Sequence, residues 1–131
     1  MTEKFNQHID YWISVAKHDL DVANTLYENK KYDSCLFFSH LCIEKILKGL
    51  WVKKNNLDFP PKTHNLLRLA KETKEEFSVG NLKFLEILND FNLEARYPDY
   101  KLTFYKLCTE EFTKEKYNKT KELFQCILEK I

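Results

Sequence analysis

Residues that break helices or form tight turns are scarce in this chain: its 131 residues include only two glycines and three prolines. Two of the prolines are adjacent, at Pro60 and Pro61, and the third is Pro98. Few places for a turn favour a few long elements over many short strands. The chain is therefore expected to be all-α, with its helices separated near these points.

Apolar residues recur every three or four positions through most of the chain, which is the spacing of one face of a helix. The first such segment runs over residues 5–27. The second, residues 32 to about 54, is apolar around most of its circumference, which is typical of a central helix. Its end is expected at Asn55 and Asn56.

Three further helices are expected. Thr63 is a candidate N-cap for the third. Gly80 is expected to separate it from the fourth, which reaches Arg96, and Thr113 is expected to cap the last. Residues 97–112 give the weakest pattern and are expected to be extended or irregular while packing on the rest. Short connections favour antiparallel neighbours, so we predict one domain over residues 1–131: an up-and-down antiparallel bundle of four main helices plus a shorter helix.

Charge and hydropathy exclude several classes of protein. The 21 Lys and Arg nearly cancel the 20 Asp and Glu, so no global field attracts nucleic acid or an anionic membrane. Residues 1–5 lack the apolar core of a signal peptide, and no uncharged run approaches the roughly 20 residues that span a bilayer. We expect a soluble, cytoplasmic protein, and any anion site must be local.

The cysteines do not form a metal or redox motif. No two of the four are spaced as C-x-x-C, so neither a zinc knuckle nor a thioredoxin-type motif is encoded. Cys35 and Cys42 are seven residues apart, which places both on one helix face as small apolar residues. We expect free thiols in the core, no metal site and no cofactor, since Glu-x-x-His pairs and His-Glu-x-x-His are also absent.

Two groups of polar residues stand out against the apolar helices. His40, Glu44 and Lys48 are spaced i, i+4, i+8 and share one stripe of the second helix. They form either a solvent-facing strip or the lining of a polar cleft. His64 follows the candidate cap Thr63, so it either helps to cap its own helix or offers a neutral imidazole to a ligand beside the helix N–H groups.

Arg96 lies where the fourth helix must end. Pro98 has no N–H and moves the preceding Tyr97 out of the α region, which makes Arg96 the cation of the last turn. Arg96 with Asp99 is either a structural pair at a helix end or a planar group that can bind phosphate oxygens.

Three segments, in this order, resemble the HEPN (higher eukaryotes and prokaryotes nucleotide-binding) domain family. They are Leu41–Leu50 (LCIEKILKGL), Pro61–Leu66 (PKTHNL) and Ala95–Asp99 (ARYPD), and the resemblance covers nearly the whole chain. It implies a helical bundle, a homodimer, a partnership with a small nucleotidyltransferase, and a role in toxin–antitoxin or other nucleotide-dependent systems.

The resemblance also implies an activity to weigh. Catalytic members cut RNA without metal, using an arginine followed four to six residues later by a histidine, with both subunits of a dimer contributing. Arginine neutralises charge at phosphorus while histidine moves protons at the 2′-hydroxyl. Arg96 matches the first half, but no histidine follows it; Tyr100 and Lys101 occupy those positions and are poor bases at neutral pH.

From these residues we predict a module that binds a nucleotide or a nucleotide-like phosphate ligand. Arg96 and Lys48 are predicted to contact phosphate and His64 to hydrogen-bond it, while Asp99 holds Arg96 and Glu44 orients Lys48. The alternative is a metal-independent ribonuclease with Arg96 and His64 as candidate catalytic residues, in which His64 would stand in for the missing histidine.

Overall fold

The computed structural model describes residues 3–131, so the first two residues of the polar N-terminal segment lie outside the described part. Within that part the secondary structure is entirely helical, as the periodicity predicts. The helices are α1 (Glu3–Glu28), α2 (Tyr32–Asn55), α3 (Leu66–Glu72), α4 (Val79–Arg96), α5 (Pro98–Leu107) and α6 (Glu110–Leu128).

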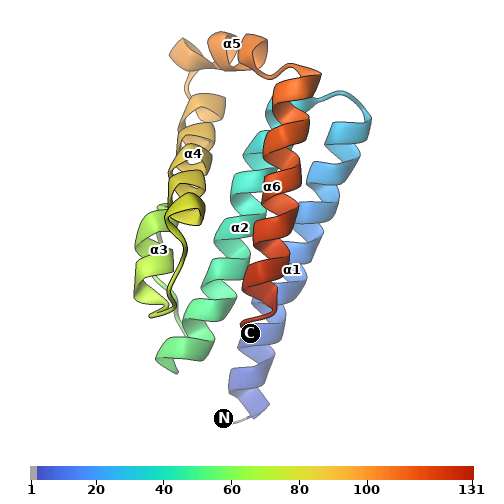
Figure 1. Ribbon diagram of the computed structural model, residues 1–131. Coiled ribbons are helices and arrows are strands. Elements are labelled where there is room, and N and C mark those ends of the chain that lie inside the picture. The colour runs from blue at the N-terminus through green and yellow to red at the C-terminus, as the bar shows by residue number, and fades with distance from the viewer. Residues whose placement is uncertain (1–2) are drawn as a thin grey trace.

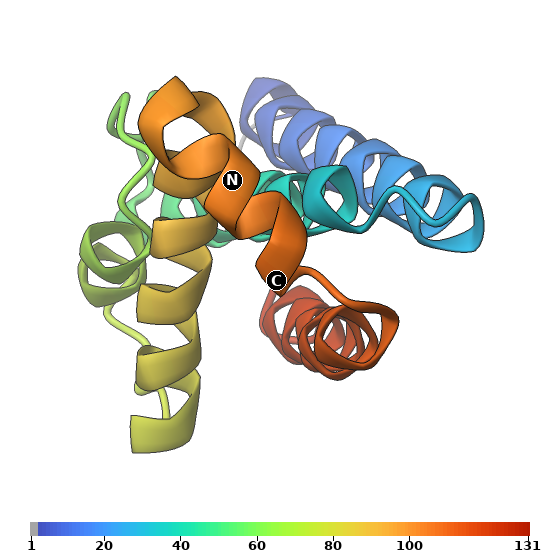
Figure 2. The ribbon, with the colours of Figure 1, turned by 90° about the horizontal axis from the view of Figure 1, so that it is seen from above.

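The long helices α1, α2, α4 and α6 run side by side as an antiparallel bundle, and α5 lies across one end of it (Figure 1). Helix α2 contacts every other helix, and seen from above it lies between α1, α4 and α6 (Figure 2). Its apolar side chains bury on nearly all sides for this reason. Leu36, Ile43, Ile46, Leu47 and Leu50 have no exposed surface.

Helices α1 and α2 approach closely at Gly49. A Cβ atom built at this position would lie 3.3 Å from Trp12 Cβ, which is tighter than ordinary van der Waals contact. Glycine thus lets Trp12 lie against α2. The Trp12 ring is then held 5.5 Å from the ammonium nitrogen of Lys48, within cation–π range.

Two predicted helix starts are wrong by a few residues. Asn65 rather than Thr63 caps α3, since its side-chain oxygen accepts from the backbone N–H groups of Leu67 and Arg68. Thr109 rather than Thr113 caps α6 by accepting from Phe112 N, and Thr113 is buried one turn inside the helix.

The predicted role of Gly80 as the separator of α3 and α4 is wrong. This glycine lies in the first turn of α4, whose N-cap is Ser78. The break lies earlier, after Thr73, where Lys74 adopts a positive φ of 65°.

The prediction of extended or irregular structure over residues 97–112 is also wrong. Pro98 ends α4 and also occupies the first turn of α5, where a missing N–H costs nothing. Tyr97 lies between them in an extended conformation. Of the apolar residues here, Phe104 packs into the core, whereas Leu102 and Tyr105 are exposed.

All four cysteines are free, as expected, and Cys35, Cys42 and Cys108 are buried in the core. Among residues 3–131, no helix is both long and apolar enough to cross a membrane.

Candidate functional site

Glu44 lies at the centre of a buried polar network on α2. Its carboxylate is 2% exposed and accepts from two cationic or polar partners. Lys48 Nζ donates to Oε2 at 3.2 Å, and His64 Nδ1 lies 2.7 Å from Oε1. The stripe on α2 is therefore not a solvent-facing strip, and three of the predicted site residues are in direct contact.

His40 holds the other side of this network in place. It has no exposed surface, and burial lowers the pKa of its imidazole to about 4, which keeps the ring neutral at neutral pH. Nε2 lies 2.9 Å from the backbone oxygen of His64 and must donate to it. Nδ1 is then an acceptor, and it receives a hydrogen bond from Asn92 Nδ2 on α4 at 3.3 Å. His40 thus joins α2, α4 and the loop that carries His64.

His64 does not cap α3, because it precedes the cap residue Asn65. Its backbone is fixed by His40 and its Nδ1 by Glu44, and since a carboxylate only accepts, Nδ1 carries the hydrogen of this contact. The side chain is nevertheless 59% exposed, and Nε2 has no hydrogen-bond partner among residues 3–131. The arrangement presents one free imidazole nitrogen to solvent, backed by a buried carboxylate.

Lys48 is less accessible to a ligand than its predicted role in phosphate contact requires. Its side chain is 9% exposed, and its ammonium lies between Glu44 and the Trp12 ring. In this position it balances the charge of a buried carboxylate, which would otherwise be costly.

Arg96 occupies a different place, at the corner where α4 meets α5. It is exposed, and no ion pair of the described residues includes it, whether with Asp99 or with the Glu44 network. Asp99 lies in the first turn of α5 and is exposed. Arg96 borders a pocket of about 220 Å³ together with Lys101, Asp33, Ser34, Phe37, Phe38 and Ala95.

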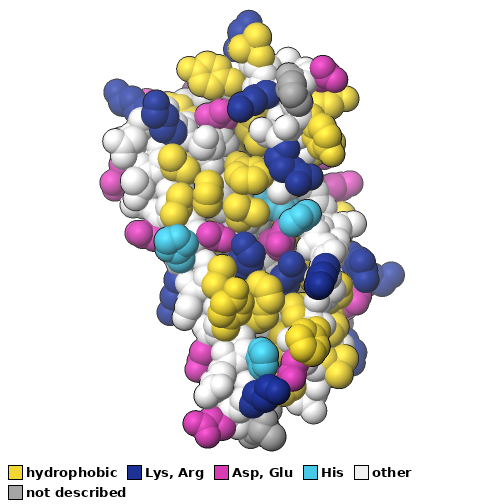
Figure 3. Space-filling view, turned by 180° about the vertical axis from the view of Figure 1, so that it is seen from behind, with side chains coloured by type: hydrophobic (Ala, Val, Ile, Leu, Met, Phe, Trp, Pro, Cys, Tyr) yellow, Lys and Arg dark blue, Asp and Glu magenta, His cyan; other side chains and the backbone are white. Residues whose placement is uncertain are grey.

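The two places share one face of α2. Phe37 in the pocket and Glu44 in the network are seven residues apart, which is two helical turns, or about 10 Å along the axis. From behind, this face shows histidine, acidic and basic side chains together at mid-height, between two groups of hydrophobic side chains (Figure 3). A ligand that extends over about 10 Å can reach both.

Three participants were missed from the sequence as site residues: Lys101, Asn92 and Phe37. Lys101 enters the pocket because α5 is a helix that begins at Pro98, and that helix was not predicted. Asn92 lies among the apolar residues of α4, so a polar side chain in an otherwise apolar stripe was the available signal. Phe37 carries no signal in the sequence beyond that of a core residue.

Comparison with known proteins supplies the family. The family model named HEPN domain matches residues 9–131. A crystal structure of TT1696 from Thermus thermophilus has a TM-score of 0.81 at 19% identity, covering 94% of this chain and 98% of that one.

A second crystal structure, of ST0689, described as an archaeal HEPN homologue, has a TM-score of 0.71 at 24% identity. The match covers 91% of this chain and 93% of that one. At these identities the two structures support the fold alone, and no curated protein matches the sequence. Because the family model covers almost the whole chain, the protein belongs to the HEPN domain family.

Proposed function

We propose that this HEPN domain binds a nucleotide or a nucleotide-like phosphate ligand on the face of α2 between Arg96 and His64. The observation that carries the proposal is the unpaired guanidinium of Arg96 in a pocket that, within the described residues, also contains Lys101 and two phenylalanine rings. Arginine binds phosphate oxygens with two parallel hydrogen bonds, and aromatic rings stack on bases.

Each residue has a defined part in this proposal. Arg96 and Lys101 contact the phosphate, and His64 offers Nε2 to the far end of the ligand. Glu44 orients His64 and Lys48 through the contacts described above. Lys48 adds positive charge at the edge of the site. Asp99 follows Arg96 by three residues in the chain but makes no ion pair with it among the described residues.

The experiment is a calorimetric titration of ATP, GTP and a short RNA into the wild type, Arg96→Ala and a control. Lys106→Ala is a suitable control because Lys106 is exposed, unpaired among the described residues and in the last turn of the same α5, but does not line the pocket. Arg96→Ala is expected to weaken binding at least tenfold and Lys106→Ala less than twofold. Equal affinities in all three proteins would refute the proposal.

A metal-independent ribonuclease is the second candidate, and the Glu44–His64 pair favours it. A carboxylate that fixes Nδ1–H leaves Nε2 able to accept a proton from a 2′-hydroxyl. This function predicts RNA cleavage that resists EDTA and disappears in both Arg96→Ala and His64→Ala. Absence of cleavage by the pure wild type would exclude it.

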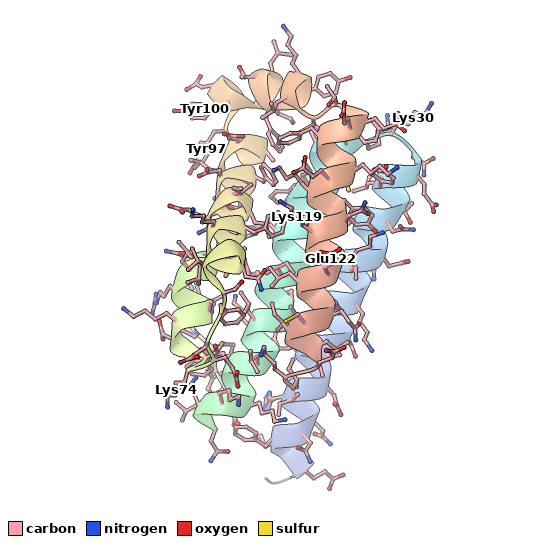
Figure 4. All side chains as sticks on the ribbon, in the orientation of Figure 1. Lys30, Lys74, Tyr97, Tyr100, Lys119 and Glu122 are labelled. Atoms are coloured by element: carbon pink, nitrogen blue, oxygen red, sulfur yellow. The ribbon has the colours of Figure 1, made fainter. Side chains whose placement is uncertain are left out.

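A homodimer is proposed as the working form. Support comes from apolar residues left exposed around the α4–α5 corner: Leu93, Tyr97, Tyr100, Leu102 and Tyr105. Tyr97 and Tyr100 project away from the bundle there (Figure 4). Exposed apolar patches of this kind mark interaction surfaces. Sedimentation of the wild type against Tyr100→Lys tests the dimer, and a monomeric wild type would contradict it.

A small nucleotidyltransferase is proposed as a further partner on family resemblance. Its test is co-purification of the product of a neighbouring reading frame with this chain, and failure to co-purify when the two are co-expressed would contradict it.

A further inference from the structure

At the end of the bundle opposite to α5, a hollow of about 520 Å³ is lined by Arg68, Lys71 and Lys74 together with Asn55 and Glu72. We name Arg68, Lys71 and Lys74 the α3 cation cluster. Three of the five lining residues are cations and one is an anion, so the hollow carries a positive charge. We propose that the α3 cation cluster is a second anion site, separate from the Arg96 pocket, and that it takes a linear oligophosphate.

The α3 cation cluster has fewer acidic partners than the neighbouring lysines Lys54 and Lys130. Lys54 makes a close ion pair with Glu75, and Lys130 lies 3.7 Å from the same carboxylate. Those interactions hold the pKa of Glu75 below its ordinary value, with the hydrogen bond from Lys54 as the main cause. By contrast, neither Lys71 nor Lys74 has an ion pair among residues 3–131.

Arg68 is only partly neutralised. Its Nε donates to Glu72 Oε2 at 2.8 Å, one turn further along α3. Within the described chain, the hollow is therefore bordered by the unpaired ammonium groups of Lys71 and Lys74 and by the guanidinium of Arg68, which makes one ion pair. Lys71 is favoured by the negative end of the α3 dipole. The dipole effect acts within the last turn. It does not account for Lys74, which lies beyond the end of the helix, or for Arg68, which lies in the first turn.

The backbone under the cluster is held firmly. Asn55 Nδ2 donates to the backbone oxygens of Trp51 and Glu72, at 3.1 and 2.8 Å, and so joins the end of α2 to the end of α3. Thr73 Oγ1 donates to Ala70 O at 2.6 Å. Lys74 then turns the chain with its positive φ. The like charges are thus brought together by the fold, against their mutual repulsion.

The lining also indicates which anion fits. No aromatic or aliphatic residue lines this hollow in the part of the chain that the structure describes, whereas Phe37 and Phe38 line the Arg96 pocket. Proteins that bind bases supply rings to stack on them. The hollow is lined by amino, guanidinium and amide groups and by one carboxylate, which already pairs with Arg68. A hollow of this size and lining instead suits a run of phosphate groups without base contacts. Such a run occurs both in a free oligophosphate and in the backbone of a nucleic acid strand.

The test uses sodium tripolyphosphate in calorimetry and a fluorescein-labelled oligouridylate in anisotropy. The variant is Lys71→Gln with Lys74→Gln, and the matched control is Lys30→Gln with Lys31→Gln. Lys30 is an exposed lysine with a positive φ of 62°, and Figure 4 shows it at the end of the molecule opposite to Lys74. The control therefore removes the same charge from a similar turn far from the hollow.

The cluster variant is expected to bind tripolyphosphate at least tenfold more weakly than the wild type, and the control less than twofold. If oligouridylate binding falls with it, the slope of log K against log salt should become shallower by about 0.7 for each phosphate that the protein no longer neutralises. If oligouridylate binding depends on the cluster, the phosphate groups that the site takes belong to a nucleic acid backbone. If oligouridylate does not bind through the cluster, they belong to a free oligophosphate.

Unchanged tripolyphosphate affinity in the cluster variant, or equal weakening in variant and control, would overturn the inference. Arg96→Ala separates this site from the proposed function. It is expected to leave tripolyphosphate binding intact, while the cluster variant keeps its affinity for ATP. Thermal unfolding of both double variants verifies folding, because replacing exposed lysines changes stability little.

Discussion

The Glu44 network and the Arg96 corner lie on one face of α2 but differ in how their charges are satisfied. Glu44 and His40 are buried, and each hydrogen-bonds to residues from other parts of the chain. Arg96 is exposed and has no ion pair among the described residues. Buried polar groups that are removed singly are costly, whereas exposed charges contribute little to stability. The first region is therefore expected to stabilise the fold, whereas the second leaves its charge available to the proposed ligand.

The largest effect is expected from Glu44→Ala. It leaves the ammonium of Lys48 and the ring of His64 without their shared acceptor, and breaking a buried charged pair costs about 3–5 kcal/mol. Urea unfolding measures this loss. Glu115→Ala is the control, since that carboxylate is 59% exposed and, among the described residues, pairs only with lysines at 3.5 and 3.7 Å. If both variants unfold at the same urea concentration, the network does not stabilise the fold.

The next largest effect on stability is expected from lowering the pH, and His40 is its cause. Its pKa of about 4 in the folded protein lies below the value of 6.5 of an unperturbed histidine. Below pH 6.5 the unfolded chain therefore binds a proton that the folded chain does not, and stability falls as pH drops from 6.5 towards 4. At about 1.4 kcal/mol per pKa unit, the loss approaches about 3 kcal/mol.

The measurement is urea unfolding across that pH range in wild type and His40→Gln, which cannot titrate at this position. The variant is expected to be less stable at pH 7 and to lose less on acidification. His18→Gln, at an exposed position on α1, is the control and should keep the slope of the wild type. Parallel profiles for wild type and His40→Gln would show that His40 is not held neutral by burial.

Much of the fold was predictable because its long helices follow the apolar period. The errors occurred where two local signals compete. Asn65 and Thr63 are both good N-caps, and the sequence alone does not rank them; Thr63 instead accepts from Asn65 N within the loop. Thr109 and Thr113 are one turn apart, and tertiary packing decides, since Thr113 is buried.

The α4–α5 corner shows why part of the site could not be predicted. Pro98 correctly predicts the end of one helix, but the same residue is also suited to begin the next. Missing α5 meant missing Lys101 as a pocket residue. The contacts of His64 with Glu44 and His40 join positions 20 and 24 residues apart, which only the tertiary structure defines. The sequence could identify these residues as candidates but could not show which of them are in contact.

A smaller effect is expected from Asn92→Leu. The substitution keeps the size of the side chain but removes the donor to His40 Nδ1, which leaves a buried acceptor unsatisfied at a cost of about 1 kcal/mol. Urea unfolding at pH 7 measures it, with Asn118→Leu on the exposed face of α6 as the control. A variant as stable as the wild type would mean that Asn92 does not hold His40.

The smallest effect on stability is expected from Arg96→Ala, and this sharpens the comparison most. The side chain has no ion pair among residues 3–131, and its guanidinium carbon lies 5.8 Å from the ring centroid of the adjacent Tyr97. Its removal should change the free energy of unfolding by about 0.5 kcal/mol or less while weakening ligand binding. Calorimetric scanning of the free protein provides the measurement. A loss of about 2 kcal/mol in the free energy of unfolding would mean that Arg96 stabilises the fold. A cation whose role is to bind a ligand contributes to the affinity for that ligand and adds little to the stability of the unbound chain.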